Sequence, residues 1–257
     1  GYPALDKVIT GLNRTDLILV AARPGMGKTS FALNIAETVS TKSQKTVAIF
    51  SLEMSSEQLA QRLLSSQALV EGKSLRTGEL SGDYWVRIAM ASQVLSKANI
   101  YLDDTPGITI GEMKAKLRRL KQVDLVIIDY LQLMSSGRRI ENRVQEVSEI
   151  TRNLKIMAKE MNVPLITLSQ LSRGPESRAD HKPMLSDLRE SGSIEQDADI
   201  VLLLYREDYY AREEAEERNI ANCDVAKNRH GEVGVVKLGW DSRYTRFTNL
   251  ELSRHEP

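Results

Sequence analysis

The strongest chemical signal in the sequence is a glycine-containing loop between an apolar run and a helical pattern. Leu17–Ala22 is apolar, helical spacing begins at Lys28, and the connection reads Ala22-Arg23-Pro24-Gly25-Met26-Gly27-Lys28-Thr29. This order of strand, loop and helix is the context of a phosphate-binding loop. Gly25 and Gly27 let the backbone turn its N–H groups toward phosphates, and the start of the helix adds a favourable dipole.

Two side chains of this loop suit nucleotide chemistry. Lys28 is placed to reach the β- and γ-phosphates of ATP, and the Thr29 hydroxyl suits Mg²⁺, which prefers oxygen ligands. The motif has glycine where this chain has Ala22, so a plain glycine-rich turn is the alternative. We expect the nucleotide to be bound by Arg23, Pro24, Gly25, Met26, Gly27, Lys28, Thr29 and Ser30.

A second apolar run supports the same site. Leu125–Asp129 is hydrophobic and ends in an acid, as a Walker B strand does. Taken alone, such an acid is more often a turn residue or a helix cap. Because the phosphate-binding loop is also present, we expect Asp129 to share Mg²⁺ with Thr29, and the predicted cofactors are ATP and Mg²⁺.

Two further polar residues follow apolar runs. Glu53 comes shortly after Thr46–Phe50, and Gln170 comes directly after Leu165–Ser169. In a parallel sheet both would emerge at the carboxyl edge, where ligands bind. Glu53 is there placed to orient and deprotonate an attacking water, and Gln170 to sense the γ-phosphate. A helix-entry acid and a loop amide are the respective alternatives.

These candidates meet only if a parallel sheet brings them together, and the remaining pattern predicts one. Apolar runs bounded by turn residues predict buried strands at Leu17–Ala22, Thr46–Phe50, Ile100–Leu102, Leu125–Asp129, Leu165–Ser169 and Ile200–Tyr205. Helical spacing lies between most of them, at Lys28–Val39, Ser56–Val70, Tyr84–Ser96, Ile110–Leu120 and Val144–Met161. Ser55 and Gln58 have the spacing of a capping box ahead of one helix. Alternation of this kind implies a parallel sheet with helices on both faces.

The pattern changes after Tyr205. Alternating apolar and polar residues predict antiparallel strands at the far edge of the sheet, at Cys223–Asn228, Val233–Trp240 and Tyr244–Asn249. The charged run from Arg206 to Glu214 is typical of a solvated helix or loop. The polar loops Ser135–Asn142 and Leu171–Lys182 are expected to be mobile. The predicted fold class is α/β, a mostly parallel sheet flanked by helices with antiparallel edge strands.

Composition limits the remaining possibilities. Of 257 residues, 41% are hydrophobic and 27% charged, so we expect one globular domain over residues 1–257. Lys+Arg and Asp+Glu both number 35, so any contact with DNA must come from local loops. Cys223, the only cysteine, fits a core residue in a reducing, cytoplasmic compartment. Apolar runs fall short of the roughly 18 residues of a membrane span, so no membrane partner is expected.

Four more motifs accompany the loop and the Walker B-like strand. They are Ser51-Leu52-Glu53-Met54-Ser55, Ser169-Gln170-Leu171-Ser172-Arg173, Asp187-Leu188-Arg189-Glu190-Ser191-Gly192 and Lys227-Asn228-Arg229, while the strand continues as Tyr130-Leu131-Gln132. In this order the motifs resemble the C-terminal motor domain of bacterial replicative DNA helicases of the DnaB type. The resemblance covers nearly the whole chain, and the combination is far more specific than the phosphate-binding loop alone.

The resemblance implies a RecA-like P-loop NTPase that forms a hexameric ring, encircles single-stranded DNA and moves along it in the 5′-to-3′ manner by hydrolysing ATP at replication forks. Within the family pattern Glu53 matches the catalytic base, Asp129 the Walker B acid and Gln170 the sensor glutamine. Lys227 and Arg229 match a basic pair that reaches the γ-phosphate bound by the neighbouring subunit, which would tie hydrolysis to assembly. Solvated cations of an exposed hairpin are the alternative for this pair.

Two loops are candidates for DNA contact. The segment Ser135–Arg143 is the most basic short stretch, and Arg189–Gly192 resembles the backbone-gripping loop of the family. Cations, small side chains and backbone N–H groups suit contacts to phosphates that do not depend on sequence. Ordinary solvated loops are the alternative. The DNA-binding residues expected are Arg138, Arg139, Arg143, Arg189, Glu190 and Gly192.

The resemblance also implies partners and leaves two other functions open. In the family, a helicase loader and primase bind the full-length protein, and an N-terminal domain and a linker helix precede the motor; we expect neither before Gly1, which would impair ring formation. A RecA-type recombinase or repair ATPase would share the fold and the loop. A nucleotide-switched DNA-binding module without turnover would share the site, but it has no need of Glu53.

Overall fold

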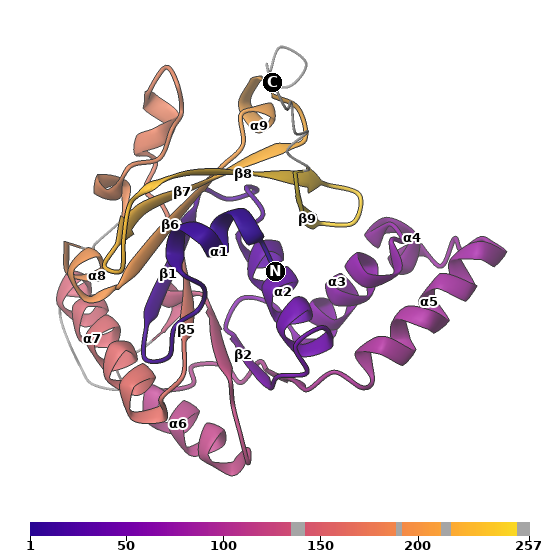
Figure 1. Ribbon diagram of the computed structural model, residues 1–257, viewed down its shortest axis with the longest axis horizontal. Coiled ribbons are helices and arrows are strands. Elements are labelled where there is room, and N and C mark those ends of the chain that lie inside the picture. The colour runs from indigo at the N-terminus through magenta and orange to yellow at the C-terminus, as the bar shows by residue number, and fades with distance from the viewer. Residues whose placement is uncertain (135–141, 189–191, 212–216, 251–257) are drawn as a thin grey trace.

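The computed structural model describes residues 1–134, 142–188, 192–211 and 217–250. Within these residues one nine-stranded sheet has the order β3-β2-β4-β5-β1-β6-β7-β8-β9 (Figure 1). The strands are β1 (Leu17–Ala22), β2 (Val47–Ser51), β3 (Ile100–Asp103), β4 (Leu125–Asp129), β5 (Leu165–Gln170), β6 (Ile200–Tyr205), β7 (Ile220–Asn228), β8 (Gly234–Asp241) and β9 (Arg246–Asn249).

The sheet is parallel from β3 to β6 and antiparallel from β6 to β9. Strand β1 lies near its middle, and all six of its residues are buried. Ile18 and Val20 pack into the core on one face, and Leu17 and Leu19 pack into the core on the other. Continuous apolar runs form these strands because helices cover both faces of a parallel sheet. The predicted strands and the antiparallel edge are confirmed, with end shifts of a few residues.

The helices divide between the two faces. The longer helices are α2 (Lys28–Thr41), α3 (Ser56–Ala68), α5 (Gly82–Leu95), α6 (Ile110–Arg119) and α7 (Arg143–Met161), and the shorter ones are α1 (Pro3–Ile9), α4 (Gly72–Thr77), α8 (Gly192–Asp197) and α9 (Asp208–Ala211). One core packs α1, α2 and α3 against the sheet, and the other packs α6, α7 and α8. In Figure 1, α3, α4 and α5 extend together to one side of the sheet.

Local signals set the helix starts. The Ser55 hydroxyl accepts from the Gln58 N–H and the Gln58 side chain accepts from the Ser55 N–H, which confirms the predicted capping box. Thr109 and Glu112 form a second capping box at α6. Helix α7 ends at Asn162, whose φ of 52° stops the helical path.

In the C-terminal part, one sequence expectation is wrong for a single residue and another is confirmed. The run beginning at Arg206 was expected to be solvated, but Arg206 itself is only 9% exposed because its guanidinium stacks over the Trp240 ring at 4.9 Å and near Tyr209. Cys223 is fully buried, as predicted. In the described part of the chain, no helix combines the length and apolar character that crossing a membrane requires.

Candidate functional site

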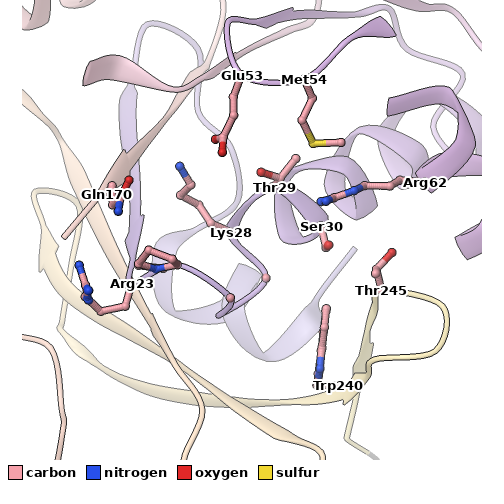
Figure 2. Close-up of a pocket in the computed structure, with 14 residues that line it drawn as sticks. Arg23, Lys28, Thr29, Ser30, Glu53, Met54, Arg62, Gln170, Trp240 and Thr245 are labelled. Atoms are coloured by element: carbon pink, nitrogen blue, oxygen red, sulfur yellow. The ribbon is translucent and has the colours of Figure 1, made fainter. Parts of the chain in front are cut away.

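The carboxyl ends of four parallel strands bring the predicted nucleotide residues together. Ala22 at the end of β1 pairs with Gln170 at the end of β5, and Ser51 of β2 pairs with Asp129 of β4. The loop after β1 borders a hollow of about 300 Å³ at this edge (Figure 2). Besides loop residues, the hollow is lined by Glu53, Met54, Arg62, Gln170, Trp240 and Thr245. The predicted meeting of these segments at one edge is therefore confirmed.

The backbone of the loop explains its glycines. Gly25 and Gly27 have φ angles of 81° and 90°, a region that side chains rarely adopt. Gly27 directly precedes α2, and it offers no side chain to cap the first helical N–H groups, which leaves them for an anion. Ala22 is still part of β1, paired on both sides, so the missing first glycine requires no special conformation.

Lys28, Thr29 and Asp129 form the polar centre of the hollow. The Thr29 hydroxyl donates to Asp129 Oδ2 at 2.7 Å, and Lys28 Nζ lies 3.5 Å from Oδ1. Lys28 also stacks over the Tyr130 ring at 4.4 Å. Burial lowers the pKa of Lys28, while the charges of Asp129 and Glu53 oppose that shift. Lys28 is thus a poorly solvated cation beside two acids, a group that gains from an added anion.

The donor set fits Mg²⁺. Asp129 is 2% exposed, and its Oδ1 accepts no hydrogen bond among the described residues, because Lys28 at 3.5 Å is an ion-pair partner only. An orphaned carboxylate oxygen beside the Thr29 hydroxyl offers the oxygen ligands that Mg²⁺ prefers. Among the described residues, no group of three or more His, Cys, Asp or Glu side chains could hold a metal ion. Thr29 and Asp129 would therefore share Mg²⁺ with phosphates and water.

Glu53 and Gln170 approach the centre from β2 and β5, the two strands that flank β4. Glu53 lies two residues beyond β2, and its carboxylate points toward Lys28 across the hollow (Figure 2). Gln170 borders the same hollow from β5. Gln132 belongs to the motif Tyr130-Leu131-Gln132, whose function the sequence does not predict. It links β5 to the segment after β4. Its Nε2 donates to Ser169 Oγ at 2.7 Å and to the Gln170 carbonyl at 3.1 Å.

Not every residue follows the sequence expectation. Met26 is 1% exposed and does not line the hollow, so of this residue only the backbone remains for phosphate binding. Arg23 lines it, but its guanidinium donates to Glu176 and, at 2.9 Å, to the Leu171 carbonyl. Sequence reasoning missed Arg62, which reaches in from α3 beside Ser30 (Figure 2). No local pattern marks such residues, since tertiary packing alone places them there.

Lys227 and Arg229 lie near the amino-terminal ends of the parallel strands, whereas the hollow lies at the carboxyl ends. Asn228, between them, pairs with Ile200 at the start of β6, level with Ile18 near the start of β1. Along β1, the distance from the level of Ile18 to the phosphate loop of the same chain is thus roughly 15 Å, at about 3.3 Å per residue. Burial, followed by the charge of Arg229, lowers the pKa of Lys227. This chain cannot supply the pair to its own hollow.

The predicted DNA-contact residues fall partly outside the described part of the chain. Arg138, Arg139, Arg189 and Glu190 lie outside it, and Gly192 begins α8. Arg143 begins α7 and is engaged within the chain: it donates to the Met134 carbonyl at 3.2 Å, the Gln132 carbonyl at 2.5 Å and the Glu146 carboxylate at 2.5 Å. This arginine ties α7 to the segment that follows β4.

Comparisons with known proteins agree with this geometry. The family model described as DnaB-like helicase C terminal domain matches residues 1–249. Replicative DNA helicase DnaC of Bacillus subtilis is 54% identical over 255 residues, which cover 98% of this chain and 56% of that protein. Replicative DNA helicase DnaB of Geobacillus stearothermophilus gives the same identity and coverage. The chain therefore spans about half the length of the curated relatives it matches.

Solved structures give the same result for the fold. A structure of a DnaB-like replicative helicase and its interactions with primase matches with a TM-score of 0.93 and 40% identity over 98% of this chain and 63% of that chain. A second solved structure, described as an ATPase domain, matches with the same TM-score and identity, over 98% of this chain and 90% of that chain. At this identity the RecA-like arrangement of the parallel sheet and its antiparallel edge is established.

Proposed function

This chain belongs to the family of DnaB-like helicase C-terminal domains, and from that premise we propose that residues 1–257 form one ATPase domain of a replicative DNA helicase. The proposed reaction is hydrolysis of ATP to ADP and phosphate at the hollow beside β1. The proposed work is movement of an assembled ring along single-stranded DNA, with duplex unwinding at replication forks.

The residues of the hollow divide the chemistry. The loop N–H groups and Lys28 hold the β- and γ-phosphates, because fixed donors and a poorly solvated cation stabilise the charge that develops there. Glu53 orients a water molecule and accepts its proton as the water attacks the γ-phosphorus and the bond to ADP breaks. Gln170, the last residue of β5, hydrogen-bonds the γ-phosphate, so the loss of this phosphate removes a contact to β5.

Thr29 and Asp129 would hold Mg²⁺. When bound, the ion would neutralise the charge of the phosphates. Asp129 contributes an anion with one unsatisfied oxygen, and Thr29 contributes its hydroxyl. Arg62, at the side of the hollow near Ser30, adds a further positive charge facing the nucleotide.

The second half of each active site comes from another subunit. Lys227 and Arg229 lie too far from the hollow of their own chain, so we propose that they act on the γ-phosphate held by a neighbour. Arg229 would donate to that phosphate, whereas Lys227, whose ammonium already donates to three carbonyls of its own chain, would contribute its charge. An arginine supplied in trans is worth about 10³–10⁵ in rate in related phosphoryl transfer. Hydrolysis therefore depends on self-association into a ring.

The remaining partners follow from the family. Single-stranded DNA is proposed to contact the segments that carry Arg138, Arg139, Arg143, Arg189, Glu190 and Gly192, mainly through its phosphates. One matched structure describes interactions of a DnaB-like helicase with primase. We propose that primase and a helicase loader bind the full-length protein of which this chain corresponds to about half.

One observation carries the proposal. Thr29 and Asp129, which are 100 residues apart in sequence, meet at 2.7 Å beside Lys28 and opposite Glu53. A hydroxyl, a buried carboxylate, a lysine and a glutamate at the carboxyl edge of a parallel sheet meet the requirements of Mg²⁺-dependent hydrolysis of a nucleoside triphosphate.

The proposal is tested by steady-state ATP hydrolysis over a range of protein concentrations, with and without single-stranded DNA. We expect the rate per subunit to rise with protein concentration, since neighbours complete each site, and to rise again with DNA. A rate per subunit that stays constant over the whole range would show that each chain works alone. No Mg²⁺-dependent turnover under any condition would overturn the ATPase assignment.

A further inference from the structure

The end of β7, which carries Lys227, and the following turn, which carries Arg229, are held from several sides. Lys227 Nζ donates to the Glu195 carbonyl, to Ala198 O at 2.6 Å and to Gln196 O at 3.3 Å. The carbonyls at the end of α8 therefore occupy the N–H donors of Lys227. The Asn228 side chain donates to the carbonyl of Val8 in α1 at 3.1 Å. These contacts fix the course of the turn, but none of them holds the Arg229 guanidinium by a charge.

Asp199 supplies that charge. This carboxylate, 4% exposed, lies directly before β6. Its Oδ1 is 3.6 Å from Arg229 Nη1, and its Oδ2 accepts from the Leu17 N–H at 2.8 Å and from Lys155 Nζ at 2.5 Å. The Arg229 N–H also donates to the Asp199 carbonyl at 2.9 Å. A single buried acid therefore connects Arg229, α7 and the start of β1.

Arg229 is nevertheless not enclosed. Its side chain is 50% exposed, and one guanidinium nitrogen donates to the Gln196 carbonyl at 2.6 Å. Because Asp199 is buried and the Arg229 side chain is half-exposed, part of this side chain stays accessible to solvent. The carboxylate limits the positions of the guanidinium without shielding it from a phosphate on another molecule.

Asp16 holds the same turn from the next strand. It lies directly before β1 and is 4% exposed, and its Oδ2 is 2.7 Å from His230 Nε2. The His230 N–H donates to Asn228 Oδ1 at 3.0 Å, which closes the turn on itself. Two buried acids at the starts of the neighbouring strands β1 and β6 thus flank Arg229.

We propose that Asp16 and Asp199 are positioning residues that aim Arg229 at a nucleotide bound by the neighbouring subunit. This inference rests on the proposed function, because it requires Arg229 to act in trans. The acids do not touch the nucleotide. They reduce the freedom of a long, half-exposed side chain, so that the guanidinium is already ordered when the neighbouring phosphate arrives.

The alternative is that these acids only stabilise the sheet edge, and the chain contains a matched control for it. Asp124 also lies directly before a parallel strand, β4, and its Oδ2 accepts from the Thr46 N–H at 3.0 Å, while Lys45 lies 3.7 Å from Oδ1. Its partners belong neither to the Arg229 turn nor to the hollow. Asp124→Asn thus removes a similar edge charge without affecting the finger.

The test compares Asp199→Asn and His230→Ala with Asp124→Asn in the full chain, using ATPase kinetics. His230→Ala breaks the Asp16 contact at an exposed position, where a folding defect is a small risk. We expect turnover per subunit to fall by about tenfold to a hundredfold in both variants, since a misplacement of about 1 Å in a catalytic group costs on that order. KM for ATP should change by less than about twofold, because the phosphate loop lies at the other edge. His230→Gln, which keeps a donor near Asp16, should recover part of the rate.

Mixing variant subunits shows whether the hollow or the trans-acting Arg229 is defective. Each variant is mixed with Glu53→Gln, in which Arg229 is intact, and Arg229→Ala is mixed in the same way as a reference. If Asp199 and Asp16 position the finger, the mixtures exceed the sum of their components, because an intact Glu53 then meets an intact Arg229. Loss without rescue, or equal loss in Asp124→Asn, would assign the acids to fold stability and overturn the inference. If both variants have normal rates while Arg229→Ala is inactive alone and regains activity in the mixture, only the inference is overturned. If Arg229→Ala is fully active, the action of Arg229 in trans, and with it that part of the proposed function, is overturned.

Discussion

At the residue scale, the site combines a buried acid that has one unsatisfied oxygen with a poorly solvated lysine. Asp129 Oδ1 is buried without a hydrogen bond among the described residues, and Lys28 is poorly solvated beside two acids. The Asp129 oxygen costs stability, because a buried polar atom without a hydrogen bond loses hydration without replacement, and Lys28 loses hydration that its ion pair with Asp129 offsets only in part. A Mg²⁺–nucleotide complex would add a ligand for the oxygen and an anion for the lysine, which explains why such costly groups occur together in this hollow.

Glu53→Gln tests the proposed base. The substitution keeps the size of the side chain but removes its ability to accept a proton, so we expect turnover to fall by about 10²–10⁴-fold. ATP affinity should stay nearly unchanged, since Lys28 and the loop hold the phosphates. Single-turnover hydrolysis and equilibrium nucleotide binding measure the two effects separately. Glu57→Gln, in the exposed first turn of α3, is the control. Full turnover in Glu53→Gln would exclude this carboxylate as the base.

Gly27→Ala tests the backbone of the loop. Gly27 has a φ of 90°, and an added Cβ would lie 3.0 Å from the Phe247 ring and 3.2 Å from the Trp240 ring. We expect a loss of stability of about 1–3 kcal/mol, the cost of such strained backbone, together with weaker ATP binding. Thermal unfolding and nucleotide titration measure both. Gly82→Ala is the control, because nothing lies within 4 Å of a Cβ there. Equal behaviour of the two variants would show that the loop tolerates the side chain.

At the element scale, α2 connects the phosphate loop to both ends of the chain. Phe31 of α2 stacks on Tyr2 at 5.4 Å and meets Phe247 of β9 edge-on at 5.3 Å. The Asn34 side-chain oxygen accepts from the Phe247 N–H at 2.7 Å. These contacts hold the first turn of α2, where the helix dipole faces the phosphates, against the sheet.

Glu37 makes the stability of α2 dependent on pH. It is 8% exposed, and burial raises its pKa above the ordinary 4.5, although the Ser66 hydroxyl donates to it at 3.0 Å. The folded chain therefore keeps this proton to a higher pH than the unfolded chain does. Stability falls as pH rises from about 4.5 through the folded pKa, because the folded state binds more protons there.

Glu37→Gln removes that loss. We expect the variant to unfold a few degrees higher than the original chain at about pH 8, and the difference to vanish below about pH 4, where Glu37 is protonated in both states. Melting curves over this range measure it. Glu79→Gln, at an exposed position, should leave the pH profile unchanged. A Glu37→Gln variant that is less stable at about pH 8 would show that the charge is well accommodated.

Elements with strong periodicity could be predicted from sequence, and packing contacts could not. The apolar runs of the parallel strands and the capping box at Ser55 depend on neighbours in sequence, so their ends were found to within a few residues. The short helices α1, α4 and α8 are too brief for a periodic signal. Trp240 and Arg62 reach the hollow only because β8 and α3 fold against α2, and Arg206 is buried by the same packing rather than solvated as its charged surroundings indicate.

At the scale of the whole molecule, the two halves of the proposed site lie at opposite edges of one sheet. The phosphate loop follows the end of β1, whereas the Arg229 turn lies beside its start. A rigid strand between them suits a ring in which the hollow of each subunit faces one neighbour and its Arg229 faces the other. Such head-to-tail contacts close into a ring when the rotation per subunit permits it.

The position of the hollow also predicts how nucleotide affects global stability. The loop joins β1 to α2, and the two hydrophobic cores meet across β1, so a ligand there stabilises the entire sheet rather than a peripheral segment. With Mg²⁺ and ATP at about 100 times the dissociation constant, linkage adds about 2.7 kcal/mol. For a chain of this size that raises Tm by roughly 5–10 °C. Lys28→Ala should abolish the increase, and Lys45→Ala, which alters a half-exposed lysine outside the hollow, should retain it. Because this measurement needs no neighbouring subunit, an increase that survives in Lys28→Ala would refute the nucleotide site itself, whatever the state of assembly.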